Sequence, residues 1–293
     1  MIKSPMNYTG GKYKLLPQIL PLFPKEDKYT TFVDLFCGGC NVAVNIRGKK
    51  IVGLTDGESM IPPQHSCKVI ANDYSTQLID IYKYFQEAGK EQVYKDIYET
   101  IDKYKLSKTN KEGYLALRSE YNKTKEIKLL YVLICFSFNN QIRFNSKGGF
   151  NMPFGMDRSS FNSALEERLG LFIDGIKDIQ FVNRSFEHVA IPEGSFVYAD
   201  CPYLISTATY NEQGGWTEKH EHLLLESLDL FNEWNIKFAL SNVLEHKGQE
   251  NTILKEWSKK YNVHFLNKRY DNCSYQVKDK YQNETQEVLI TNY

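Results

Sequence analysis

The sequence contains no apolar run long enough to span a bilayer, and no internal repeat or low-complexity tract. Its first residues, MIKSPMNYTGGKY, lack the basic-then-apolar layout of a signal peptide. We therefore expect a cytoplasmic protein with no membrane partner. The 293 residues, 42% hydrophobic and 14% aromatic, suffice for one large domain or two smaller ones around a buried core.

Disulfide bonds and a zinc site are not indicated either. The six cysteines are scattered through a chain too large to need disulfide staples, so free thiols are expected. Cys37 and Cys40 form a C-x-x-C with His65 and Cys67 downstream, but a zinc site would need a second clean pair. We expect these residues to pack or to shape loops, and we expect no metal.

The net charge of zero argues by itself against a nucleic-acid partner, but the charge is unevenly distributed. Residues 102–147 contain ten Lys and Arg against four Asp and Glu, a net charge of +6, so the rest of the chain carries −6. A basic segment within an acidic chain predicts a phosphate-binding surface. A solvated, lysine-rich helical face explains residues 102–128 equally well.

Short apolar runs alternate with amphipathic segments, which predicts an α/β fold with a mostly parallel sheet. The predicted strands are TTFVDLF, KKIVGL, KVIAND, FVYADC, IKFALSN, VHFLN and EVLITN, and the predicted helices are SALEERLGLFIDGI, EHLLLESLDLFNEW and NTILKEWSKKY.

The strand pattern stops in the middle of the chain. From residue 76 to residue 161 the sequence is helical in pattern and rich in tyrosine and lysine, and it ends in the loop-like NNQIRFNSKGGFNMPFG. We interpret residues 76–161 as an inserted helical domain, and residues 1–75 with 162–293 as the domain that contains the sheet. Residues 48–66 resemble a surface excursion, to which we assign no chemistry.

The stretch FVYADCPY, residues 196–203, is the most informative part of the sequence. An apolar strand ended by Pro202 would place Asp200 and Tyr203 at the carboxyl end of a strand, where α/β sheets bind ligands. The Asp200 carboxylate and the Cys201 carbonyl can accept the two protons of a base amino group, and Tyr203 can stack on the ring. Taken alone, an ordinary strand and Asp-x-Pro turn explain these residues too.

The segment FVDLFCGGCNV, residues 32–42, predicts a strand, a glycine turn and a helix. Gly38 and Gly39 would let the backbone approach a ligand, and Asp34 could hold a cation or a hydroxyl group. Asp73 closes the next strand, where an acid can bind ribose hydroxyls. The segment does not match G-x-G-x-x-G, which argues against a nicotinamide dinucleotide, and a plain strand-to-helix turn would also explain it.

A third segment, NYTGGKYKLLPQILPLFP, begins at Asn7. It places two glycines and Lys12 ahead of an amphipathic stretch. Lys12 could neutralise a carboxylate, and Tyr8 could pack on a purine or on a sulfonium-bearing chain. An N-terminal helix with a glycine lead-in is the simpler interpretation.

Together and in this order, the three segments closely resemble the Dam-like, D12-class N6-adenine-specific DNA methyltransferases. That family has an aromatic-x-Gly-Gly-Lys motif, an acid-x-Phe-x-Gly loop, an inserted target-recognition domain and a final Asp-Pro-Pro-Tyr. The resemblance spans nearly the whole chain. It implies a Rossmann-like S-adenosylmethionine-dependent methyltransferase sheet with an inserted, mainly helical DNA-recognition domain.

The resemblance implies an activity: site-specific transfer of a methyl group from S-adenosylmethionine to N6 of an adenine flipped out of double-stranded DNA, with GATC as the favoured target. The implied catalytic residues are Asp200, Cys201, Pro202 and Tyr203. The implied cofactor-binding residues are Tyr8, Gly11, Lys12, Asp34, Phe36, Cys37, Gly38, Gly39, Asp73 and Asp200. The implied DNA-binding residues are Phe138, Asn139, Gln141, Arg143, Asn145, Lys147 and Pro153, among which Arg143 would contact a guanine. A monomer in a bacterial or phage-infected cell is expected, and a cognate restriction endonuclease is a partner that the resemblance allows.

Three departures from the family pattern keep alternatives open. Cys40 takes a place often filled by glycine or another small residue, which affects the expected shape of the loop. Cys201 replaces the first proline of Asp-Pro-Pro-Tyr, and Gln141 stands where studied members of the family have leucine, so the base that is read could differ. One alternative is a noncatalytic DNA-binding relative that lost turnover through the change at Cys201. The other is a methyltransferase acting on RNA or on a protein glutamine, which would not need Arg143 and the basic insertion.

Overall fold

The computed structural model describes residues 1–46, 67–205, 215–266 and 285–293. The chain forms two compact units. The first contains residues 1–13, 38–45 and 75–183, and the second contains residues 14–37, 46–74 and 184–293. The predicted strand KKIVGL and the predicted excursion at 48–66 lie outside the described residues.

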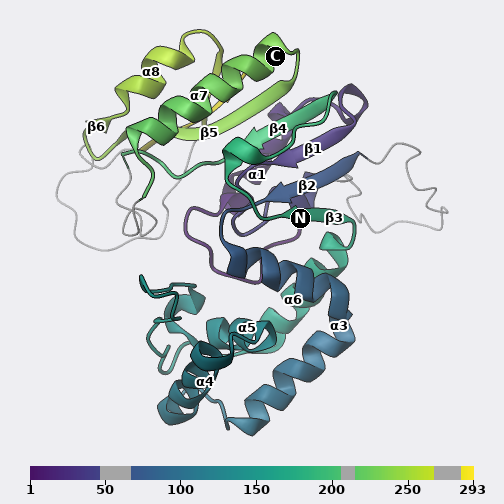
Figure 1. The fold of residues 1–293 in the computed structure, drawn as a ribbon, viewed down its shortest axis with the longest axis vertical. Helices are drawn as coiled ribbons and strands as arrows, with labels where there is room; N and C mark the ends of the chain where they lie inside the picture. Colours follow the sequence, from purple (N-terminus) through teal and green to yellow (C-terminus); the bar gives the residue numbers. More distant parts are fainter. Residues whose placement is uncertain (47–66, 206–214, 267–284) are drawn as a thin grey trace. The chain divides into compact units, whose positions relative to one another are not determined.

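The second unit contains a mostly parallel sheet (Figure 1). Its strands are β1 (Thr31–Asp34), β2 (Lys68–Asn72), β4 (Ser195–Ala199), β5 (Lys237–His246), β6 (Gln249–Glu250), β7 (Asn262–Leu266) and β8 (Thr285–Thr291). The strand order is β2-β1-β4-β5-β8-β7, with β6 paired to β5. The first four strands of this order run parallel, whereas β8 is antiparallel to both β5 and β7. The predicted α/β class with a mostly parallel sheet is confirmed.

The central strands are buried throughout. Every residue of β1 and β4 is buried, which is typical of parallel strands covered on both faces. The register pairs Asp34, the last residue of β1, with Ala71 of β2 and with Tyr198 of β4. These three neighbouring strands therefore end at nearly the same level of the sheet.

Two capped helices pack beside β5. They are α7 (Glu218–Glu233) and α8 (Thr252–Ser258), which contact each other and β5. Thr217 and His220 form a capping box at the start of α7, and the Asn251 side chain accepts a hydrogen bond from the Leu254 N–H at the start of α8. Both helices were predicted from their amphipathic pattern.

The N-terminal amphipathic segment does not form one long helix. It divides into η1 (Lys12–Leu15), α1 (Leu16–Ile19) and η2 (Leu20–Leu22), and the short turns η3 (Glu26–Lys28) and η5 (Phe186–His188) occur further along the chain. Pro17 and Pro21 each lack the N–H that a continuing helix would use, so the segment is limited to short turns.

The first unit is mainly helical. It contains α3 (Thr76–Lys103), α4 (Lys111–Thr124), α5 (Ile127–Phe136), η4 (Phe138–Asn140), α6 (Ser163–Ile176) and β3 (Ile179–Val182), and α2 (Ala43–Ile46) begins in it. Helix α5 is buried from Leu129 to Phe136 and packs against α3 and α4, while α3 also packs against α6. Residues 76–136 are thus predominantly helical as predicted.

The bounds of this unit differ from those of the predicted insertion. Residues 1–13, 38–45 and 162–183 group with the helices, because the N-terminal segment and the glycine loop contact each other and α6 packs on α3. The division into a catalytic domain and an inserted domain stays a prediction. Strand β3 was not predicted, since its apolar run is only four residues long.

Two further features concern the described residues. The five cysteines in the described ranges are free thiols, and Cys273 lies outside those ranges. No described helix is both long and apolar enough to cross a membrane.

Gly89 interrupts α3 with φ 72° and ψ 168°, a backbone region that essentially only glycine adopts. We predict that Gly89→Ala lowers the free energy of unfolding by about 1–3 kcal/mol. The cost is that of the backbone alone, because an added Cβ would meet no atom within 4 Å. Urea denaturation measures it. The control Glu87→Ala, at an exposed helical position, should stay within about 0.5 kcal/mol of the parent. Equal stability of the two variants would contradict the prediction.

Candidate active site

Three carboxylates lie at the carboxyl ends of neighbouring parallel strands in the second unit. Asp34 is the last residue of β1 and its exposed fraction is 1%. Asp73 follows β2 directly and Asp200 follows β4 directly, and both are partly exposed. The sequence predicted all three at strand ends, and the parallel register brings them to one edge of the sheet. This edge is where open α/β sheets bind ligands.

Asn72 fixes the loops at this edge. Its Nδ2 donates to the Leu35 carbonyl (3.0 Å) and to the Arg184 carbonyl (3.1 Å), and its Oδ1 accepts from the Arg184 N–H (3.0 Å). Its backbone carbonyl accepts from the Cys37 N–H (2.7 Å). One buried amide therefore ties the β1 loop to the segment around Arg184. Sequence reasoning missed Asn72, although its position beside Asp73 at a strand end was a signal.

The turn after β4 is held by a second acid. The Tyr203 hydroxyl lies 3.3 Å from Asp200 Oδ1 and 3.2 Å from Glu287 Oε1, so its single proton is shared between two carboxylates. Burial, followed by the charges of Asp200 and Glu287, raises the pKa of Tyr203 well above its ordinary value. Tyr203 thus stays a neutral donor, and its ring is fixed beside Asp200. Glu287, on β8 and almost completely buried, was not singled out from the sequence.

Cys201 and Pro202 complete this turn. Cys201 is buried, and its Sγ lies 3.5 Å from Asn242 Nδ2 on β5. Pro202 is partly exposed. All four predicted catalytic residues, from Asp200 to Tyr203, therefore lie together in one turn of the second unit.

A buried carboxylate lies behind the turn. Glu221, in the first turn of α7, has an exposed fraction of 0%. Its Oε1 accepts from Asn251 Nδ2 (2.9 Å) and from Asn242 Nδ2 (3.3 Å), and its Oε2 accepts from Trp216 Nε1 (2.5 Å). Burial raises the pKa of Glu221 above its ordinary value, while the three N–H donors act in the opposite direction. Sequence reasoning missed this group, because its partners are distant in the chain.

Three aromatic rings cluster beside the β1 loop. The Phe36 ring centroid lies 5.7 Å from that of Trp216 and 5.4 Å from that of Phe186, and the Trp216 and Phe186 centroids are 5.6 Å apart. Only Phe36 was predicted as a site residue. Tyr74, next to Asp73, is 81% exposed. Flat rings beside carboxylates suit a ligand that combines a planar ring with hydroxyl groups.

In the first unit, the aromatic ring of the N-terminal motif packs on the glycine loop. A Cβ added at Gly38 would lie 2.9 Å from Tyr8 Cε1, and one added at Gly39 would lie 3.1 Å from Tyr8 Cβ. Gly38 has φ 45°, in the left-handed region. The sequence predicted these three residues as cofactor-binding, and the structure brings them together.

The same loop is fastened by buried hydrogen bonds. The Tyr82 hydroxyl donates to the Gly38 carbonyl (2.6 Å), and Asn41 Oδ1 accepts from the Ser4 N–H (2.9 Å). Gly11 closes a turn through its N–H to the Tyr8 carbonyl (3.1 Å). Lys12 is buried and donates to the Gly10 carbonyl (3.1 Å).

These residues fit S-adenosylmethionine, the cofactor implied by the resemblance. In the second unit, partly exposed carboxylates at strand ends can accept hydrogen bonds from hydroxyl and ammonium groups. In the first unit, Gly38 and Gly39 present only backbone atoms at positions where a side chain would collide with Tyr8. Among the residues that the structure describes, no His, Cys, Asp or Glu side chains are grouped so as to hold a metal ion.

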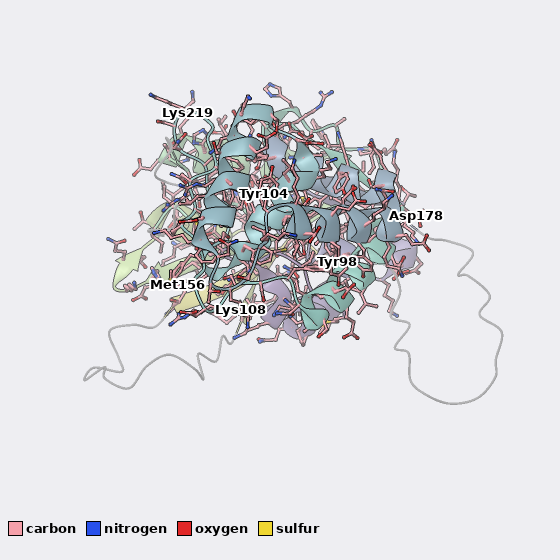
Figure 2. The ribbon with its side chains drawn as sticks, turned by 90° about the horizontal axis from the view of Figure 1, so that it is seen from below. Tyr98, Tyr104, Lys108, Met156, Asp178 and Lys219 are labelled. Atoms are coloured by element: carbon pink, nitrogen blue, oxygen red, sulfur yellow. The ribbon has the colours of Figure 1, made fainter. Side chains whose placement is uncertain are left out.

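The predicted DNA-binding residues share one segment of the first unit, from 138 to 153. The isolated bridges Phe144–Phe150 and Ser137–Phe154 shape it, and Asn122 on α4 exchanges two hydrogen bonds with the backbone of Phe150. The exposed members are Phe138, Asn139, Arg143, Asn145, Lys147 and Pro153, and Gln141 is partly exposed. Two residues labelled in Figure 2 belong to the same unit: Tyr98 lies on α3, and Lys108 lies in the connection after α3.

Within this segment the side chains differ in their constraints. Asn145 Oδ1 accepts from the Lys147 N–H (3.0 Å) and the Gly149 N–H (2.9 Å), so it closes the loop tip. Arg143 Nε donates to Asn151 Oδ1 (2.9 Å) and its Nη2 donates to the Asn151 carbonyl (3.1 Å). Asn151, which was not predicted, therefore holds one edge of the guanidinium group and leaves the Nη1 end directed away from this contact.

The buried bond from Tyr82 to Gly38 gives a test of the glycine loop. We predict that Tyr82→Phe lowers the free energy of unfolding by about 1–3 kcal/mol, because the Gly38 carbonyl loses a buried donor, and that it also weakens binding of S-adenosylmethionine. Tyr114→Phe is the matched control, since Tyr114 is equally buried and its hydroxyl donates to the Met152 carbonyl (2.9 Å). The control should lose stability and keep its cofactor affinity, measured by calorimetric titration. Equal cofactor affinities in the two variants would remove the glycine loop from the binding site.

Comparison with known proteins gives the same assignment for the chain. The family model of the D12 class of N6 adenine-specific DNA methyltransferases matches residues 8–272. The match includes the N-terminal glycine motif, the loop after β1 and the turn after β4.

Named relatives agree with the family match. The chain is 46% identical over its whole length to the type II methyltransferase M.FokI of Planomicrobium okeanokoites, and 42% identical to the modification methylase StsI of Streptococcus sanguinis. It spans 43% of the length of each of these curated relatives. It is 25% identical to the DNA adenine methylase of Escherichia coli strain K12, over 90% of this chain and 87% of that protein. The chain belongs to the D12 class of N6 adenine-specific DNA methyltransferases.

Proposed function

We propose that this chain transfers a methyl group from S-adenosylmethionine to N6 of an adenine in double-stranded DNA. The observation that carries the proposal is the turn from Asp200 to Tyr203 at the end of β4, in a chain whose family is defined by this reaction. The carboxylates Asp34 and Asp73 end the two neighbouring strands.

The turn supplies the acceptors that an amino group needs. The Asp200 carboxylate and the Cys201 backbone carbonyl accept the two amino protons, which localises the nitrogen lone pair towards the methyl group. Tyr203, fixed by Asp200 and Glu287, stacks on the base. Positioning and preorganised dipoles contribute most to the rate, because two reactants are brought together. S-adenosylmethionine supplies the methyl group when bound.

The cofactor assignment rests on the chemistry of each side chain. Asp73 accepts hydrogen bonds from the ribose hydroxyls. The ring cluster of Phe36, Phe186 and Trp216, with Tyr74, offers flat surfaces for the purine. For Asp34, Cys37 and the residues of the first unit (Tyr8, Gly11, Lys12, Gly38 and Gly39), the role of contacting the cofactor stays a prediction from the family motif.

The substrate assignment rests on the segment 138–153 and on the basic composition around it. The adenine must leave the base stack to reach Asp200, and the cost of a few kcal/mol is offset by stacking and by phosphate contacts. GATC is the target that the resemblance to the family favours. M.FokI and StsI are named as a type II methyltransferase and a modification methylase, and these names support a cognate restriction endonuclease as a partner. A monomer in a bacterial or phage-infected cell stays a prediction from the family resemblance.

Transfer of a labelled methyl group tests the proposed function. Purified protein with labelled S-adenosylmethionine is incubated with duplex DNA, RNA or cell protein. Label in adenine of duplex DNA supports the proposal. DNA binding without transfer would indicate a noncatalytic relative, and label in RNA or protein would indicate a different substrate. Comparing the transfer of label to GATC-containing duplexes and to duplexes of other sequence identifies the target.

The carboxylate of Asp200 is predicted to be essential. Asp200→Ala should lower the single-turnover methylation rate by at least about 100-fold, as when a preorganised polar group is removed from an active site, with duplex DNA binding largely retained. Cys201→Pro keeps the backbone carbonyl and restores the usual residue of the family. The stiffer turn should offset the loss of the contact between Asn242 and Cys201 Sγ, so this variant should keep the activity. Rates are compared at saturating S-adenosylmethionine. If the Asp200→Ala variant methylates DNA at the parental rate, the turn after β4 is not the catalytic site.

Arg143 is predicted to discriminate between bases. Arg143→Ala should reduce the preference for the cognate site over one-base variants by about 1–3 kcal/mol, because a guanidinium group contacts guanine through two N–H groups. Asn151→Ala should act in the same direction with a smaller effect, since one of the two contacts that hold Arg143 remains. The control Lys147→Ala should weaken the binding of all duplexes alike. It should also reduce the slope of log affinity against log salt concentration by about 1. If Arg143→Ala lowers methylation of the cognate site and of the one-base variants equally, Arg143 contacts only phosphate.

A further inference from the structure

The buried Glu221 carboxylate connects two parts of the candidate active site. On one side, Asn242 Nδ2 bridges Glu221 Oε1 (3.3 Å) and Cys201 Sγ (3.5 Å), so a single residue connects Glu221 with the turn after β4. On the other side, Trp216 Nε1 donates to Glu221 Oε2, and the Trp216 ring meets Phe36 edge-on at 80°.

The carboxylate and its two asparagine donors come from three different elements. Glu221 lies on α7, Asn242 on β5, and Asn251 at the start of α8, where Asn251 also caps the helix through its Oδ1. Each amide and the indole present an N–H to the carboxylate. No described Lys or Arg is paired with Glu221 in an ion pair, so its solvation is replaced by these neutral donors.

A group of this kind is costly to bury. An ionisable side chain away from water destabilises the protein unless its hydrogen bonds are made, and a hydrophobic residue of similar volume is often as stable or more so. Its value here lies in geometry, since one carboxylate fixes the orientations of an indole and an amide that the chain separates by 26 residues.

We propose that Glu221 is a positioning residue for methyl transfer, which holds Trp216 and, through Asn242, the turn at Cys201 in a single arrangement. The proposal rests on the proposed function, because it assigns Glu221 an effect on groups that would contact cofactor and base. Glu221 acts through other residues, and we assign it no contact with the reacting atoms.

Glu221→Gln tests the proposal. The amide keeps the size of the side chain but replaces one acceptor oxygen by an NH2 group, which must face the N–H of either Trp216 or an asparagine. We expect the single-turnover methylation rate at saturating cofactor and DNA to fall by about 10- to 100-fold, by analogy with side chains that orient metal ligands. Duplex DNA affinity should stay within about twofold of the parent.

Glu218→Gln is the matched control. Glu218 lies in the same first turn of α7, is exposed, and loses the same charge at the same helix end. Its methylation rate should stay within about twofold of the parent. Thermal melting of both variants separates a loss of folding from a loss of positioning, and rates are measured well below the lower melting temperature.

A second variant keeps the test decisive if Glu221→Gln does not fold. Trp216→Phe retains an aromatic ring but removes the N–H donor to Glu221 and makes the ring smaller, so it should lower the rate in the same direction. In the Trp216→Phe background, Glu221→Gln should cost less than it does in the parent. A folded Glu221→Gln protein with the parental rate, or a Trp216→Phe protein with the parental rate, would overturn the inference. If the parent protein itself labels no duplex DNA, the proposed function fails instead, so the two failures are distinguishable.

Discussion

Parallel pairing of β2, β1 and β4 is the constraint on which the candidate site in the second unit depends. Because the register matches Asp34 with Ala71 and with Tyr198, the chain leaves three adjacent strands at one level, and an acid ends or follows each of them. The backbone hydrogen bonds of the sheet thus determine which carboxylates are neighbours. Hydrogen bonds of side chains then fix the loops, and the Asn72 side chain anchors the loop after β1.

Buried polar groups carry most of the remaining positioning. Glu287 and Asp200 share the proton of Tyr203, while Glu221 gathers donors from Trp216 and from two asparagines. Such groups are costly in a core unless every bond is made, so they specify one arrangement of the side chains around them. In the first unit the equivalent fastening is the bond from Tyr82 to the Gly38 carbonyl, which holds the left-handed glycine of the loop.

The segment that carries the predicted DNA contacts follows a different principle. It has few backbone ladder bonds and is shaped by side chains: Asn145 closes its tip, Asn122 ties it to α4, and Asn151 holds Arg143. An exposed segment built in this way can differ in sequence among family members without disturbing the helices beneath it. The favoured target sequence is accordingly the property that depends most on a few exposed residues.

The sequence by itself determined the α/β class, most strands and helices, and the acids at strand ends, because apolar runs, prolines and glycines act locally. It also determined the family, since three short motifs occur in a fixed order. Only the tertiary structure revealed Asn72, Glu221, Glu287 and Trp216 as parts of the candidate site, because their partners are distant in the chain and no local pattern encodes such pairs. It also placed residues 1–13 and 38–45 with the helices, since that grouping depends on long-range contacts such as Ser4 with Asn41.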